Sequence, residues 1–246
     1  MINTGYVIVT ERDTNPYSST YNQTRTRTYE DTTLCPIGWK MYYRIDGNGY
    51  NQGQTVYDYL PCSADGIITQ ADVNSVLYRD YSYDWNLKQV EIGTCVTTIG
   101  DSAFTGRAAS TSDNYAIKRR QLATVILPDT ITEIGNYAFD YCTALTSITV
   151  PDSVTTIGNE AFKECTRLAS ATLGSGITSI GSNAFYYSYT LSSLTCKATT
   201  PPTLGSGALT STNTNLVIYV PASSLNAYKA ATGWSTYASK IQAIPS

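Results

Sequence analysis

Apolar residues recur at fixed positions through the second half of the chain. Four segments begin at evenly spaced leucines: Leu122, Leu145, Leu168 and Leu191. In every segment the leucine is followed by an apolar residue at the third and the fifth position. A constant period of this length predicts a repeat architecture, in which one unit stacks on the next.

One unit of this pattern predicts a strand followed by bends. In the unit that begins at Leu145, apolar Ile148 and Val150 flank a polar residue, which is typical of a strand. Pro151 ends that strand because it cannot donate a ladder hydrogen bond. Gly158 predicts a tight bend, since glycine tolerates positive φ. The apolar residues that follow have a short helical spacing: Ala161, Phe162 and Cys165.

A single unit cannot bury these apolar side chains alone, whereas stacked units can. We therefore expect equivalent residues to form columns along the stack, with leucine on leucine and Phe162 between Phe139 and Phe185. Cys165 falls on Cys142 in the same way. A small buried side chain explains both cysteines, in preference to a metal or redox role.

These units resemble the 23-residue leucine-rich repeats of the BspA-like subclass. The matching elements are the strand followed by LPDTITEIGNYAFDYC and by VPDSVTTIGNEAFKEC. The resemblance is specific through residues 122–190 and extends, with defects, over roughly 87–215. It implies a curved solenoid with parallel strands on the concave side. It also implies a surface-displayed protein of a host-associated bacterium, with a role in adhesion and protein binding.

The predicted fold class is α+β. It consists of a right-handed leucine-rich-repeat solenoid with a concave parallel sheet, preceded by a small antiparallel β domain. Parallel strands are expected near residues 90–92, 125–127, 148–150, 171–173 and 194–196. The predicted domains are a Tyr-rich β-hairpin domain (1–62), a connecting helix and N-terminal cap (63–86), the repeats (87–215) and a C-terminal cap (216–246).

The N-terminal region, 1–62, lacks the leucine period and is dense in tyrosine. Its alternating segments predict two hairpins in one small antiparallel sheet, with strands at 6–10, 24–29, 41–45 and 55–60. A weak internal repeat ends in Cys35 and again in Cys62. Export would favour a Cys35–Cys62 disulfide, while two free thiols remain the alternative.

Both caps show a helical pattern. Thr69 and Asp72 form an incomplete capping box ahead of an amphipathic helix that carries Val73, Val76 and Leu77. Such a helix would cover the open end of the solenoid. At the other end, a strand at 215–221 precedes two short apolar stripes, the first ended by Gly233. The stripes are Leu225 with Tyr228, and Trp234 with Tyr237 and Ile241.

The first repeat begins at Leu87 and is longer than the others. The step from Leu87 to Leu122 is about half as long again as the step from Leu122 to Leu145, and the extra residues fall between Thr105 and Gln121. Insertions in repeats map to loops on one face and often carry function. The alternative is a solvated loop, and in either case its deletion is expected to leave the melting temperature nearly unchanged. The candidate ligand-binding residues of the insertion are Tyr115, Lys118, Arg119 and Arg120.

The outward positions of the strands form the second candidate surface. They carry mainly small hydroxylated side chains: Thr124, Ile126, Ser147, Thr149, Ser170, Thr172, Ser193 and Thr195. The predicted face covers on the order of 400 Å², about half of one side of a standard protein interface. It therefore suits a protein, peptide or glycan ligand that is held weakly or with help from another surface.

Composition removes most catalytic and cofactor chemistry. The chain has no histidine, so Ser-His-Asp, Cys-His and His-metal sites are excluded. Asp129 and Asp152 recur at one repeat position, which indicates a structural role. Calcium at residues 46–51 fits the EF-hand pattern poorly, and a hairpin turn explains these residues better. No enzyme activity, cofactor or metal is predicted.

Charge and hydropathy exclude two classes of partner. The net charge of −3 argues against nucleic acid binding, which needs clustered Lys and Arg. No apolar run is long enough to insert in a membrane. The sequence shows no signal peptide, yet the resemblance implies an extracellular or cell-surface location.

Three classes of function remain. The favoured one is a non-catalytic surface recognition or adhesion module. The alternative is a structural spacer or fibre-like component of a larger surface or particle assembly, with self-association through the edges of the N-terminal sheet. An enzyme is the least favoured.

Overall fold

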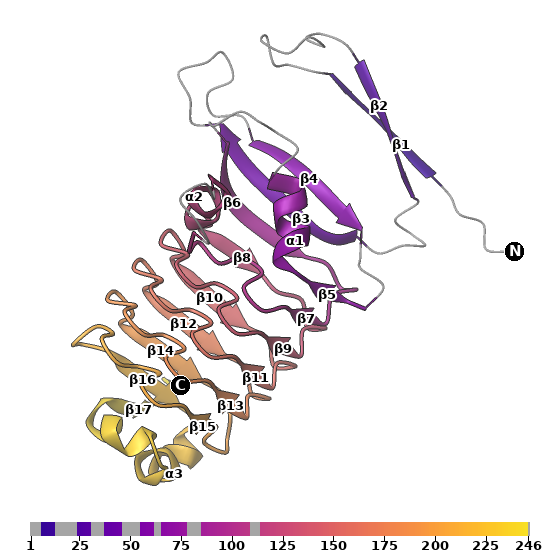
Figure 1. The fold of residues 1–246 in the computed structure, drawn as a ribbon. Coiled ribbons are helices and arrows are strands. Elements are labelled where there is room, and N and C mark those ends of the chain that lie inside the picture. The colour runs from indigo at the N-terminus through magenta and orange to yellow at the C-terminus, as the bar shows by residue number, and fades with distance from the viewer. Residues whose placement is uncertain are drawn as a thin grey trace, which may run out of the picture.

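The coils of the chain stack into a solenoid, which Figure 1 shows from the side. The structure is a computed structural model and describes residues 6–12, 24–30, 37–45, 55–61, 65–77, 85–108 and 114–245. The N-terminal strands lie at one end of the stack and the C-terminal helices at the other (Figure 1).

Two parallel sheets run along the stack. The first, here called the long-strand sheet, has the order β10 (Ser147–Val150), β12 (Ser170–Leu173), β14 (Ser193–Cys196), β16 (Val217–Val220) and β17 (Ile241–Ala243). The second, the short-strand sheet, joins β15 (Thr203–Leu204), β13 (Ser179–Ile180), β11 (Thr156–Ile157), β9 (Glu133–Ile134), β7 (Thr98–Ile99) and β5 (Ile67–Ile68). The predicted strand positions in the repeats are confirmed.

The first coil is joined to the N-terminal region by backbone hydrogen bonds. Its strand β6 (Trp85–Ile92) pairs parallel with β8 (Thr124–Ile126) and antiparallel with β3 (Ile37–Ile45). Strand β3 also pairs antiparallel with β4 (Thr55–Pro61), so this hairpin extends the sheet of the first coil.

The hairpin formed by the first two strands of the chain does not belong to this sheet. Strands β1 (Tyr6–Arg12) and β2 (Thr24–Glu30) pair antiparallel in a sheet of their own. The expectation of one sheet for both hairpins is therefore wrong, because β3 finds its second partner in the solenoid. The Cys35–Cys62 pair and the turn at residues 46–49 lie outside the described residues.

A helix precedes the first coil, as the sequence predicts. Helix α1 (Gln70–Leu77) begins at a reciprocal cap in which the Thr69 N–H donates to Asp72 Oδ2 at 2.8 Å. The Asp72 N–H donates in turn to Thr69 Oγ1 at 3.3 Å. Asp therefore completes the capping box although Glu is the commoner partner. Val73 is fully buried in the core of the solenoid.

The C-terminal cap covers the last coil. It contains the 3₁₀ helices η1 (Ala222–Ser224) and η2 (Trp234–Lys240) and the helix α3 (Leu225–Ala230). Tyr228 and Trp234 are fully buried and donate to the carbonyls of Ala198 and Pro202 at 2.9 and 2.7 Å. Ile241 opens the extra strand β17 instead of belonging to a helical stripe.

A column of phenylalanine rings forms the centre of the solenoid. Phe104, Phe139, Phe162 and Phe185 are fully buried, with successive ring centroids 5.3 Å apart and nearly parallel planes. This confirms the expected column. The residues around Phe162 form consecutive turns, however, and not the helix that their spacing indicated.

The cysteine column has a polar role as well as a packing role. The Cys142 thiol donates to the Phe104 carbonyl and the Cys165 thiol to the Phe139 carbonyl, each at 3.2 Å. Ser188 occupies the equivalent place and donates to the Phe162 carbonyl at 3.0 Å. Burial raises the pKa of both thiols, which keeps the protons needed for these bonds.

Cys95 behaves differently from the cysteines of this column. It is disulfide-bonded, whereas Cys142, Cys165 and Cys196 are free and buried. Peptide mapping without reduction is expected to find Cys95 in a disulfide and the other three alkylated only after unfolding. A Cys35–Cys62 bridge would leave Cys95 without a partner, so detecting that bridge would contradict this result.

Polar side chains join the coils on the side of the short-strand sheet. The hydroxyls of Thr132, Thr155 and Thr178 each donate to a carbonyl of the preceding coil, at 3.0–3.2 Å. The Asp152 carboxylate accepts the Ser175 N–H at 2.8 Å, and this bond lowers the pKa of Asp152. The structural role expected for Asp152 is thereby supported.

Candidate interaction surfaces

The long-strand sheet brings the predicted outward residues together on one face. Its parallel register places Ser147 beside Ser170 and Ser193, and Thr149 beside Thr172 and Thr195. Strand β8, with Thr124 and exposed Ile126, lies next to β10 (Figure 1). We call the outward side chains of these four strands the hydroxyl face: Thr124, Ile126, Ser147, Thr149, Ser170, Thr172, Ser193 and Thr195.

The hydroxyls of β10, β12 and β14 differ from those of the threonines that precede the short strands. Within the described part of the chain, the six Ser and Thr side chains of β10, β12 and β14 have no protein hydrogen-bond partner. The threonines beside the short-strand sheet, in contrast, are bonded to carbonyls of the preceding coil. The hydroxyl face thus offers a regular array of donors and acceptors to a ligand.

Larger side chains lie at both ends of the array of hydroxyls. At one end is Ile126, with Glu91 beside it on the next strand; at the other end Tyr219 lies beside Thr195. Ile126 is 45% exposed. The face therefore combines a polar centre with an apolar side chain at each end.

The inserted segment is not the free loop that the sequence indicated. Part of it forms helix α2 (Asn114–Arg120), in which Ala116 and Arg119 are fully buried. Arg119 donates from Nε to the Thr105 carbonyl and from Nη1 to Asn74 Oδ1 of α1. Arg119 is therefore removed from the candidate ligand-binding residues. Because the insertion carries these buried contacts, we expect its deletion to lower the melting temperature, contrary to the prediction from the sequence.

Arg120 also has a role within the fold. Its Nε donates to the Gly106 carbonyl at 2.8 Å, and its guanidinium lies 5.0 Å from the centre of the Tyr141 ring. The side chains of Tyr115 and Lys118 lie outside the described residues. Their part in ligand binding stays a prediction.

Replacing Arg119 by alanine is expected to lower the free energy of unfolding by roughly 1–3 kcal/mol, because two buried or half-buried acceptors lose their donor. Chemical denaturation would measure this loss. Ile117→Ala on the same helix is the matched control, since Ile117 is 57% exposed. An Arg119 variant as stable as the parent would contradict the buried role of this side chain.

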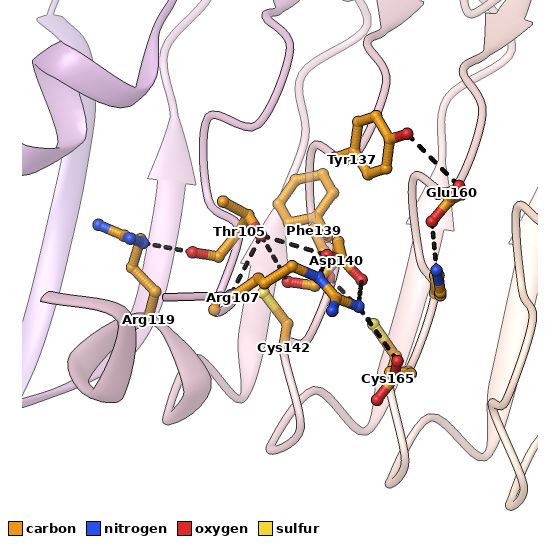
Figure 2. A network of polar contacts seen from close by, with 12 residues as sticks. Thr105, Arg107, Arg119, Tyr137, Phe139, Asp140, Cys142, Glu160 and Cys165 are labelled. Carbon is orange, nitrogen blue, oxygen red and sulfur yellow. Dashed lines mark hydrogen bonds and ion pairs between the residues drawn. The ribbon is translucent and has the colours of Figure 1, made fainter. Parts of the chain in front are cut away.

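A strip of charged and aromatic residues follows the turns after the phenylalanines. Arg107 donates from Nε to Asp140 Oδ2 at 2.7 Å and from Nη2 to Glu164 Oε1 at 3.1 Å (Figure 2). Asp140 is almost fully buried, while the Arg107 side chain is 47% exposed. Burial raises the pKa of Asp140, and the guanidinium of Arg107 offsets this only in part.

Three tyrosines continue this strip in the next coil. The ring centroids of Tyr186 and Tyr187 are 4.0 Å apart, and those of Tyr187 and Tyr189 are 5.5 Å apart. Tyr189 is 54% exposed. We call these three residues the tyrosine platform. The repeat pattern does not predict it, because the two positions after each phenylalanine change from coil to coil while the apolar positions recur.

Comparison with known families decides the identity of the repeats. Six copies of the BspA type leucine rich repeat region match residues 110–230. Residues 110–230 form a BspA-type leucine-rich repeat region. Such repeats create extended surfaces that generally serve protein–protein interaction. Among the described residues, no group of three His, Cys, Asp or Glu side chains could hold a metal ion.

A leucine rich repeat protein is among the solved structures that resemble this chain. The leucine rich repeat protein of T. pallidum is 23% identical over 55% of this chain and 73% of that protein, with a TM-score of 0.38. A search of curated proteins found no match. Within the described residues, no helix is long and apolar enough to cross a membrane.

Proposed function

We propose that this chain is a non-catalytic recognition module that acts in adhesion at a bacterial cell surface, and that it binds a protein or peptide through the hydroxyl face. The observation that supports this most directly is the row of outward hydroxyls on β10, β12 and β14. Threonines beside the short-strand sheet are bonded within the fold, whereas the hydroxyls of β10, β12 and β14 have no partner within the described part of the chain.

The shape and chemistry of the face favour a polypeptide. Every peptide group other than that of proline carries one donor and one acceptor, which hydroxyl side chains can pair with. Ile126 and Tyr219 at the ends of the face provide apolar contacts, and tyrosine is enriched where binding energy concentrates. The face is small, so we expect an affinity in the micromolar range unless a second surface contributes.

An array of extracellular matrix proteins and peptides would test this proposal, with Thr172→Arg as the blocking variant. Thr172 lies at the centre of the face, and an arginine there would displace any ligand that follows the strands. Binding is expected to fall at least about tenfold. Thr156→Arg is the matched control because Thr156 is an outward, half-buried threonine on the short-strand sheet.

Two outcomes would reject the proposed site. One is parent-like binding by Thr172→Arg. The other is an equal loss in Thr156→Arg, which would indicate an effect of charge or stability and not of the face.

The second candidate function is a structural component of an assembly. It is favoured by the β1–β2 hairpin, a two-stranded sheet whose strands have free edges in the described structure. Such edges can pair with another chain. Light scattering after size-exclusion chromatography would support this function if the mass rises with concentration, and a concentration-independent monomer would reject it.

A further inference from the structure

The function proposed for the hydroxyl face leaves the tyrosine platform without a role. The ring planes of the two neighbouring pairs are tilted by 36° and 33° at centroid distances of 4.0 and 5.5 Å, so the three rings pack against one another in one aromatic cluster, of which Tyr189 is the most exposed member. The rings belong to one turn of one coil. No equivalent cluster occurs at the same positions of the preceding coil, which carry Lys163, Glu164 and Thr166.

The backbone beneath the platform is held firmly. The Tyr186 N–H donates to the Asn183 carbonyl at 3.0 Å and the Tyr187 N–H to the Thr210 carbonyl of the next coil at 3.3 Å. Phe185 and Ser188, which bracket the first two tyrosines, are fully buried. The rings therefore need little reorganisation to receive a ligand, which lowers the entropic cost of binding.

The cations near the platform are paired with carboxylates. The Lys163 amino group lies 6.0 Å from the centre of the Tyr186 ring and also bonds to Glu160. Glu164 is paired with Arg107. Each of these cations thus has a carboxylate beside it, and Arg107 is paired with Asp140 as well, so neither cation is left unpaired for an anionic ligand. A side-chain hydrogen bond with Tyr187 raises the pKa of Tyr186.

We propose that the tyrosine platform binds a neutral carbohydrate chain. Sugar rings present apolar C–H faces that pack on aromatic rings, and their hydroxyls accept and donate to phenols and to paired charges at the rim. A strongly anionic ligand would have to compete with Glu160 and Glu164 for the nearby cations. A protein partner needs about 800 Å² on each side, far more than three half-exposed rings supply.

This inference rests on the proposed recognition role but assigns it to a second surface. Native gels that contain soluble neutral polysaccharides (laminarin, mannan, xylan or dextran) test it directly, because a bound polysaccharide retards the protein. The platform variant combines Tyr186→Ser, Tyr187→Asn and Tyr189→Ser. Asparagine is chosen at 187 because this residue has φ of 61°, which asparagine tolerates.

Tyr137→Asn is the matched control. Tyr137 is also an exposed tyrosine with positive φ, 56°, but it lies at a different position of its coil and bonds to Glu160 (Figure 2). Thermal melts of all variants ensure that folded proteins are compared.

At least one polysaccharide is expected to retard the parent and the Tyr137 variant. The platform variant should lose roughly tenfold or more in apparent affinity. The proposal is overturned if no neutral polysaccharide retards the parent, or if both tyrosine variants lose retardation equally. Retardation by heparin alone would also overturn it, since that would indicate ionic binding. Thr172→Arg should bind polysaccharide as the parent does. The proposal for the hydroxyl face and the proposal for the tyrosine platform can therefore be rejected independently.

Discussion

Replacing Phe162 by alanine is expected to lower the free energy of unfolding by about 3–5 kcal/mol. The ring is fully buried between Phe139 and Phe185, with centroids at 5.3 Å on both sides. Each neighbouring ring is anchored to its own coil, so the structure around an alanine cannot collapse to fill the cavity. Urea denaturation and thermal melting would both measure the loss.

Phe162→Leu is the appropriate control. The chain places buried Leu209 where the next coil would carry the phenylalanine after Phe185, so the column already accepts a leucine at its end. The leucine variant is expected to lose clearly less stability than the alanine variant, because less volume is removed. Equal melting temperatures for the parent and the alanine variant would contradict a packed column.

The period of the sequence predicted the solenoid because every unit repeats the same local preferences. Strand alternation, the Leu and Phe columns and the cap at Thr69 depend on residues close in sequence or at a fixed spacing. The pairing of β3 with β6 could not be predicted in this way. It joins strands that β4, β5 and α1 separate along the chain, and their alternation fits several partners equally well.

Arg119 shows why the inserted segment was misread. A run of three basic residues ordinarily marks a solvated surface. Here α2 packs beside the first coil, and the Thr105 carbonyl and Asn74 accept bonds from the guanidinium in a buried position. These acceptors come from segments that are distant in sequence, so no local pattern announces them. The hydroxyl face, in contrast, was predictable because strand alternation alone decides which side chains point outward.

Replacing Gly158 is the second substitution that we expect to change stability by a large amount. The sequence predicted a bend with positive φ at this glycine, but the structure gives a different reason for it. Its φ is not positive, and the left-handed residues of the turns are instead Glu160 and Glu164. A Cβ at Gly158 would lie 2.5 Å from both Asn136 N and the carbonyl carbon of Gly135 in the preceding coil. Glycine is thus required for close approach between coils.

Gly158→Ala is therefore expected to cost about 3 kcal/mol or more, at the upper end of the range for overpacked cores. The atoms that the new methyl group meets are backbone, and Gly158 N–H is itself bonded to the Ile134 carbonyl at 2.8 Å. Neither coil can move away without loss of such bonds. Chemical denaturation would measure the effect, and a loss below about 1 kcal/mol would contradict the close approach.

Ser211→Gly provides the opposite test on the same kind of turn. Ser211 is exposed and has φ of 57°, a conformation that costs most side chains about 1–2 kcal/mol. Glycine relieves this strain but is more flexible in the unfolded chain, so stability is expected to stay constant or to rise by up to about 1 kcal/mol. Close approach between coils at Gly158 predicts a loss of stability in Gly158→Ala. Backbone strain at Ser211 predicts unchanged or higher stability in Ser211→Gly. A loss above about 1 kcal/mol in Ser211→Gly would contradict relief of strain at Ser211, and a gain in Gly158→Ala would mean that the conformational freedom of glycine outweighs the contact between coils.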